Sequence, residues 1–146
     1  MQIQPALIGS RPKHTSNPVG NSLEYSAEVA PHGDTIRATT TVAVSKKLQL
    51  LVVHLSMDRT AVSSDQEPAH FGVHINPANG SEYVAIAIDL ENKSLNAHEE
   101  IFIHVGLTIL EGDVLNVHTS DLSVSGTIRY TANILFETID IQSSHI

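Results

Sequence analysis

The sequence predicts an all-β protein, an antiparallel β-sandwich of about eight or nine short strands. Apolar and polar residues alternate along most of the chain, which is the pattern of half-buried strands, and no segment shows a convincing helical period. Turn signals separate the alternating segments at regular intervals. The clearest alternation lies near the end of the chain, where one face carries Ile128, Tyr130, Ala132, Ile134 and Phe136.

Length and composition indicate one globular domain. The chain has 146 residues, of which 41% are hydrophobic and only 4% aromatic, so we expect one mainly aliphatic core. The absence of cysteine excludes disulfides, thiolate catalysis and cysteine-bound metals. A formal net charge of −8 argues against nucleic acid as a direct partner. No apolar run approaches the roughly 18 residues that span a bilayer, so we expect no membrane partner either.

Residues 1–21 are predicted to form an extended N-terminal arm, because their prolines and glycines break helices and central strands. The arm carries apolar residues that we expect to dock on another surface, and it holds two basic residues on an otherwise acidic protein. A frayed terminus is the alternative interpretation. The candidate docking residues are Ile3, Leu7, Ile8, Arg11 and Lys13.

Residues 22–141 are predicted to form the sandwich, and residues 142–146 a loose C-terminal tail. The expected strands alternate around turns at 31–34, 77–80 and 111–113, with polar connections at 58–68 and 91–99. The number of strands and the long connections favour a jelly roll. An immunoglobulin-like sandwich is less suitable, since the chain has no Cys or Trp for its core.

Two predicted strands carry apolar residues on both faces. In residues 48–57, both faces of the strand carry apolar side chains. In residues 82–90, one face is aliphatic and the other carries small and aromatic side chains. In an antiparallel sheet, burial on both faces points to a second layer, and we expect that layer to be another subunit. Coverage by the arm or by a long loop is the alternative. The candidate interface residues are Leu51, Val53, Leu55, Tyr83, Ala85 and Ala87.

The nine histidines require a test for a metal site. His70 and His74 share one face of a predicted strand, but four residues at about 3.3 Å each separate their backbones by about 13 Å, so one metal should not bind both. His54, His104 and His118 fall on three strands and would serve a cupin-like enzyme, the least favoured function. The sequence lacks a nucleophile elbow and a phosphate-binding glycine loop. We therefore expect no enzyme, no catalytic residue, no metal and no cofactor.

Short runs of the sequence resemble small jelly-roll decoration proteins of tailed bacteriophages, also called cement or auxiliary head proteins. The runs are LEGDVL at 110–115, TSDLS at 119–123 and GTI at 126–128, with IGSRP at 8–12 and NPVGN at 17–21 in the arm. The resemblance implies a TNF-like jelly roll that forms a homotrimer. It also implies a non-enzymatic structural protein of the virion, which binds the major capsid protein on the outer surface of the head and stabilises the shell. The alternative is a trimeric tail-fibre or receptor-binding head domain that recognises glycans.

Overall fold

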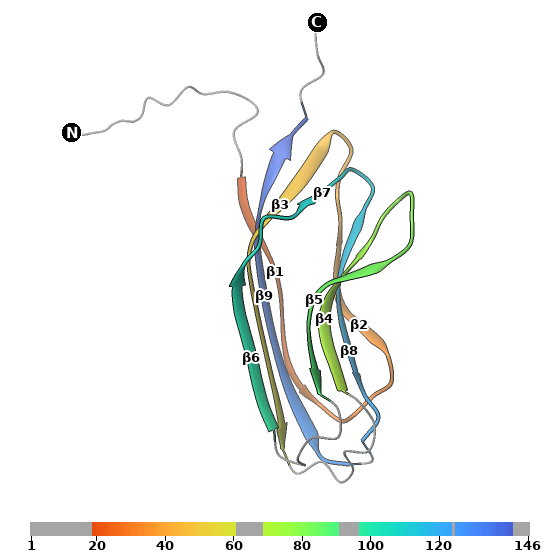
Figure 1. Cartoon of the computed structure of the whole chain (residues 1–146), viewed down its shortest axis with the longest axis vertical. Coiled ribbons are helices and arrows are strands. Elements are labelled where there is room, and N and C mark those ends of the chain that lie inside the picture. Colours follow the sequence, from red (N-terminus) through yellow and green to blue (C-terminus); the bar gives the residue numbers. More distant parts are fainter. Residues whose placement is uncertain (1–18, 61–68, 91–96, 124, 142–146) are drawn as a thin grey trace, which may run out of the picture.

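The computed structural model describes residues 19–60, 69–90, 97–123 and 125–141. In these residues the chain forms nine strands arranged in two facing antiparallel sheets (Figure 1). The described residues contain no helix that could cross a lipid bilayer. The strands are β1 (Val19–Val29), β2 (Thr35–Thr41), β3 (Lys46–Thr60), β4 (Ala69–Asn76), β5 (Tyr83–Leu90), β6 (Ala97–His104), β7 (Thr108–Ile109), β8 (Val114–Asp121) and β9 (Thr127–Asp140).

The order of the strands is that of a jelly roll, which confirms the predicted fold class. One sheet has the order β1-β9-β3-β6, with the short β7 also paired to β3, and the other has the order β2-β8-β4-β5. Without β7, the strand pairs are nested, because the first pairs with the last, the second with the seventh, the third with the sixth and the fourth with the fifth. A long hairpin rolled into two sheets gives this pattern.

The core lies between the two sheets and is mainly aliphatic, as the composition predicts. Every residue of the predicted inward face of β9 is buried. Phe71 of β4 contacts Tyr130 of β9 across the core, with ring centroids 4.9 Å apart in an edge-to-face arrangement. Burial raises the pKa of the Tyr130 hydroxyl, and the nearby Asp121 carboxylate raises it further. This tyrosine therefore joins the two sheets as an uncharged side chain.

A β-bulge explains the apolar residues on both predicted faces of β3. The register with β9 shifts between Leu50 and Val52, so the side chains before and after the bulge face the same core. Val53 and Leu55 are 1% and 0% exposed inside the sandwich. Their assignment to a subunit interface is therefore wrong, and only the bulge residue Leu51, at 37% exposure, remains accessible.

A second bulge has the same effect in β5. The register between β4 and β5 shifts at Val73 and His74, so that Ala85 has no partner in β4. Ala85 consequently packs against the core, and Val84 points outward with 50% of its surface exposed. The bulge in β3 therefore accounts for Val53 and Leu55, and the bulge in β5 accounts for Ala85.

An ion pair is buried where the two sheets meet beyond the apolar core. Nε of Arg59 in β3 lies 2.8 Å from Oδ2 of Asp121 in β8, and both side chains are at most 1% exposed. Ser123 completes the group, since it accepts a hydrogen bond from Arg59 and donates one to Oδ1 of Asp121. Arg59 lies in β3 and not in a loop, because residues 58–60 of the predicted loop at 58–68 belong to this strand.

Other predicted boundaries also shift. Residues 19–21, which the sequence assigned to the arm, pair with β9, so the sandwich includes Val19. Residues 100–110 alternate continuously in the sequence, but in the structure this segment is divided between β6 and β7. Residues 1–18 of the arm and residues 142–146 of the tail lie outside the described residues, and so do all five proposed docking residues of the arm.

Candidate functional site

Three histidines lie together on the outer face of the β2-β8-β4-β5 sheet. The alternation of β4 turns Phe71, Val73 and Ile75 into the core, and it turns His70, Gly72 and His74 outward. Gly72 lies between Ala87 of β5 and His118 of β8 in the register of the sheet. Small residues at positions 72 and 87 leave the space above this part of the sheet to the histidine rings.

His70 and His74 touch each other, although a regular strand separates their backbones by about 13 Å. Their Nε2 atoms are only 2.7 Å apart, because both rings lean toward each other over Gly72. A Cβ atom on Gly72 would lie 2.8 Å from Nε2 of His70, so the ring occupies the place where any other residue would carry its side chain. The sequence-based argument compared backbone positions and did not include the reach of the two rings.

His118 closes the cluster from the neighbouring strand. Its ring stacks on the ring of His74 with centroids 3.9 Å apart and an angle of 5° between the ring planes. The residue is only 7% exposed. Nε2 of His118 has no hydrogen-bond partner among the described residues, although it is buried. A buried ring nitrogen without a partner is costly, so a ligand that pairs with this atom would recover that free energy.

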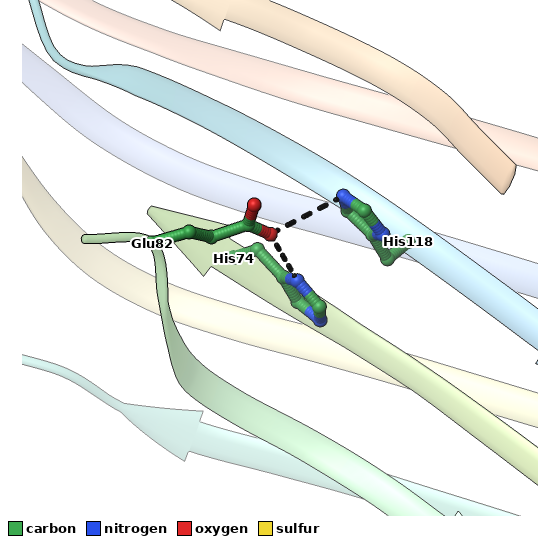
Figure 2. Close-up of side chains that lie close together, drawn as sticks. All are labelled: His74, Glu82 and His118. Atoms are coloured by element: carbon green, nitrogen blue, oxygen red, sulfur yellow. Dashed lines mark hydrogen bonds and ion pairs between the residues drawn. The ribbon is translucent and has the colours of Figure 1, made fainter. Parts of the chain in front are cut away.

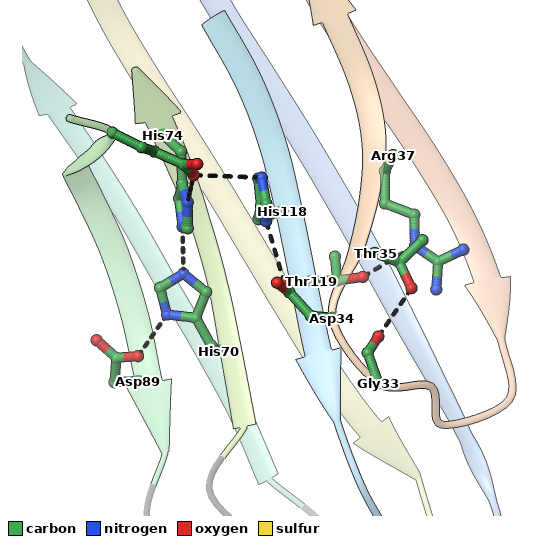
Figure 3. A network of polar contacts seen from close by, with 10 residues as sticks. Gly33, Asp34, Thr35, Arg37, His70, His74, Asp89, His118 and Thr119 are labelled. Carbon is green, nitrogen blue, oxygen red and sulfur yellow. Dashed lines mark hydrogen bonds and ion pairs between the residues drawn. The ribbon is translucent and has the colours of Figure 1, made fainter. Parts of the chain in front are cut away.

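Three carboxylates surround the three rings (Figure 3). Oδ1 of Asp89 lies 2.6 Å from Nδ1 of His70, and Oδ1 of Asp34 lies 3.1 Å from Nδ1 of His118. Glu82 lies between the other two rings, with Oε2 2.7 Å from Nδ1 of His74 and 3.6 Å from Nε2 of His118 (Figure 2). We call these residues the histidine cluster, defined as His70, His74, His118, Asp34, Glu82 and Asp89.

The electrostatics of the cluster favour the uncharged form of His74. Its pKa is lowered from the ordinary value because burial removes water from the charged ring. The hydrogen bond that the charged ring donates to Glu82 opposes this effect, and the two neighbouring histidines lower the pKa further. An uncharged imidazole offers a nitrogen lone pair, which is what a metal ion or a hydrogen-bond donor requires.

His54, His104 and His118 do not converge, so the geometry does not support the cupin-like site. His54 and His104 belong to β3 and β6 in one sheet, whereas His118 is on the outer face of the other sheet. His54 instead pairs with Glu100, with Nε2 and Oε2 2.5 Å apart. This pairing is the main cause of the lowered pKa of the Glu100 carboxyl.

The outer face of the first sheet carries an exposed apolar patch beside His54. Phe102 of β6 is 65% exposed and Leu135 of β9 is 45% exposed, while Val52 of β3 lies between these two strands. The ring of Phe102 lies 5.6 Å from that of His54 and 6.4 Å from that of His104, measured between centroids. We call Phe102, Leu135 and Val52 the Phe102 patch.

Two further interface candidates, Tyr83 and Ala87, lie in β5. Tyr83, at the start of β5, is 43% exposed, and Ala87 is partly buried on the outer face beside Gly72.

Sequence reasoning missed the histidine cluster, although one signal was present. The spacing His-x-Gly-x-His on a strand places a residue without a side chain between two outward-facing rings.

Comparisons with known proteins do not assign this chain to a family. No protein-family model matches the sequence, and no curated protein matches it. A structure of infectious bursal disease virus, Gx strain, is similar over 95% of this chain with 13% identity and a TM-score of 0.47, and the chain spans 37% of that protein. A structure of Eiger TNF from S. frugiperda is similar over 89% of this chain and 97% of that one, with 10% identity and a TM-score of 0.42.

A third solved structure, of Desmodium yellow mottle tymovirus, is similar over 99% of this chain and 94% of that one. Its sequence identity is 12% and its TM-score is 0.35. All three likenesses are too distant to carry an argument about function. The jelly-roll assignment rests on the strand order of this chain.

Proposed function

We propose that the protein is a non-enzymatic structural component of a virion, a homotrimer that binds the outer surface of a phage capsid and stabilises the shell. The observation that carries this proposal is the Phe102 patch, an apolar surface on the outside of a jelly roll. An aromatic side chain that is 65% exposed on a strand gains free energy when a partner covers it. The resemblance to decoration proteins supports a major capsid protein as that partner.

A closed trimer requires two different surfaces on each subunit, because a three-fold contact joins unlike faces of neighbouring copies. The chain offers exposed apolar residues on both sheets, with the Phe102 patch on one and Tyr83 at the start of β5 on the other. Leu51, next to Val52 in β3, extends the first surface. In the proposed trimer, the Phe102 patch of one subunit contacts the Tyr83 side of the next.

Contact with the shell is assigned to the arm. Ile3, Leu7 and Ile8 would bury apolar surface, and Arg11 and Lys13 would pair with acidic residues of the major capsid protein. Three arms on one trimer bind three related sites, so the effective concentration of the second and third arms multiplies a modest single contact. Extra surface buried across junctions between shell subunits stabilises the shell without any chemical reaction.

Light scattering after size-exclusion chromatography tests the trimer, with variants Phe102→Ser and Tyr83→Ser. Leu122→Ser is the matched control, since Leu122 is 54% exposed and belongs to neither surface. We expect a trimer for the unchanged chain and for the control, and a smaller species for both interface variants. A monomeric unchanged chain would overturn the trimer.

Co-sedimentation with undecorated heads of the virus that encodes the chain tests the capsid contact. We expect the full chain to pellet with the heads and a variant lacking residues 1–18 to stay in solution as a trimer. A full-length trimer that ignores the heads would overturn decoration. Glycan-array binding by that trimer would then favour the receptor-binding alternative.

A further inference from the structure

The histidine cluster contains more acceptor contacts than its protons can satisfy. Five close contacts join its members in a row, namely Asp89–His70, His70–His74, His74–Glu82, Glu82–His118 and His118–Asp34. Carboxylates only accept hydrogen bonds, and each uncharged imidazole carries one proton. Three uncharged rings therefore supply three protons to five contacts, and two contacts remain without one.

One choice of ring tautomers places both unsatisfied contacts at Glu82. In that choice, Nδ1 of His70 donates to Asp89, and its Nε2 accepts the proton on Nε2 of His74. Nδ1 of His118 donates to Asp34. Nδ1 of His74 and Nε2 of His118 then both direct lone pairs at the Glu82 carboxylate. They lie 2.7 Å and 3.6 Å from its negatively charged Oε2 atom.

We propose that His74, Glu82 and His118 bind a divalent transition-metal ion, with zinc the best match to two imidazole nitrogens and one carboxylate oxygen. One ligand atom from each residue lies within 4.8 Å of the other two. Zinc binds such atoms at about 2.0–2.1 Å in a tetrahedron, which sets neighbouring ligand atoms about 3.3 Å apart. The two separations from Oε2 of Glu82, 2.7 and 3.6 Å, bracket that value. The stacked rings of His74 and His118 must tilt toward each other to direct both lone pairs at one ion. Glu82 is 43% exposed, and water supplies the fourth ligand from the solvent side.

The rest of the cluster acts as support for the metal ligands. His70 fixes the ring of His74 by accepting its other proton, and Asp89 fixes His70. Asp34 does the same for His118. Ring nitrogens held in this way are the usual outer contacts of metal-binding histidines, and their removal weakens metal affinity by about 10- to 100-fold. The three carboxylates also supply the negative charge that a dication requires.

Two additional protons are the competing way to satisfy the cluster. They would create two imidazolium ions among three rings that are in contact. The stacked rings of His74 and His118 have centroids only 3.9 Å apart, and Nε2 of His70 lies 2.7 Å from that of His74. Like charges at such distances repel strongly. A metal satisfies the same two contacts with a single ion held against a carboxylate.

Equilibrium dialysis of the full chain against zinc chloride, after removal of bound metal with a chelator, tests the proposal. We expect one zinc ion per chain with the unchanged protein. Glu82→Gln and His118→Ala should each weaken zinc binding at least tenfold, and circular dichroism confirms that the variants are folded. His54→Ala is the matched control, because His54 also pairs with a carboxylate but lies on the opposite sheet. It should keep the affinity of the unchanged chain.

Nitrogen chemical shifts of the histidine rings identify the bound atoms. Zinc should shift Nδ1 of His74 and Nε2 of His118, and Nε2 of His74 should keep its proton. Glu82→Gln is the decisive variant, since its exposed side chain is not needed for packing. The proposal fails if the unchanged chain takes up no stoichiometric zinc. Equal affinity in Glu82→Gln, or an equal loss in His54→Ala, also overturns it.

Discussion

Arg59 and Asp121 form a buried ion pair between strands of the two different sheets, with Nε and Oδ2 2.8 Å apart. Asp121→Asn keeps the shape of the side chain but leaves the Arg59 guanidinium without its counter-charge. Breaking a buried pair from one side costs about 3–5 kcal/mol. We expect urea unfolding to show a loss of that size. Arg129→Met removes an exposed pair with Glu28 and should change the free energy of unfolding by less than about 1 kcal/mol. Similar losses in both variants would contradict this prediction.

Gly72→Ala should disrupt the histidine cluster and destabilise the fold. The added methyl group would lie 2.8 Å from Nε2 of His70, 2.9 Å from Cβ of Ala87 and 3.0 Å from the carbonyl oxygen of Ile86. Because the carbonyl belongs to the backbone, the ring of His70 must move. We expect a loss of about 1–3 kcal/mol in chemical unfolding, together with loss of the His70–His74 contact in ring-nitrogen spectra. Gly106→Ala is the control, since a Cβ there meets no atom within 4 Å. An undisturbed His70 ring in Gly72→Ala would disprove the prediction.

The metal-free protein should lose stability as the pH falls below about 6.5. His74 has a lowered pKa in the folded chain, so between that lowered value and its unfolded value of 6.5 the unfolded chain binds more protons. Stability is therefore fully present above pH 6.5 and decreases as the pH falls toward the folded pKa. Unfolding curves at a series of pH values measure this slope. His74→Gln should flatten it over the same interval, and an unchanged slope would show that His74 is not responsible.

Zinc should stabilise the folded chain, because the site of His74, Glu82 and His118 exists only when three separate segments are assembled. A ligand at about 100 times its dissociation constant adds about 2.7 kcal/mol to the free energy of unfolding. Thermal unfolding with increasing zinc should show a midpoint that rises with the logarithm of the concentration. Excess chelator should reverse the rise. The same titration of Glu82→Gln should be displaced to at least tenfold higher zinc concentrations, and a curve that coincides with that of the unchanged chain would point to another site.

The sequence was sufficient to predict the strands, and it was insufficient to predict how they shift against one another. The alternation in β9 gave every core residue of that strand, since a strand without a bulge keeps its period of two. In β3 the bulge at Leu51 resets the period, so Val53 and Leu55 look like outward residues in the sequence and lie in the core. Nothing in the local composition marks a bulge, because it depends on the partner strand.

The histidine cluster was hidden for a different reason. Its ligands come from β4, from β8 and from the turn before β5, and the register between these strands is a property of the whole sheet. The role of Gly72 can be read from the sequence, because this residue lies midway between His70 and His74. Arg59 was also missed, because a charged residue at the end of a strand usually lies in a solvated loop. Only the tertiary fold brings Asp121 to it.

The nested pairing of the strands also sets the order in which the molecule can be made. β9 follows all the other described strands in the sequence, yet it lies between β1 and β3 in the sheet. Translation adds about 5–20 residues per second. Until β9 has been synthesised, a nascent chain therefore exposes the apolar faces of β1 and β3, which β9 later joins. Folds dominated by such distant pairings close slowly, in about milliseconds to seconds. The sandwich closes after translation has passed residue 140, and until then chaperones have an open sheet to bind.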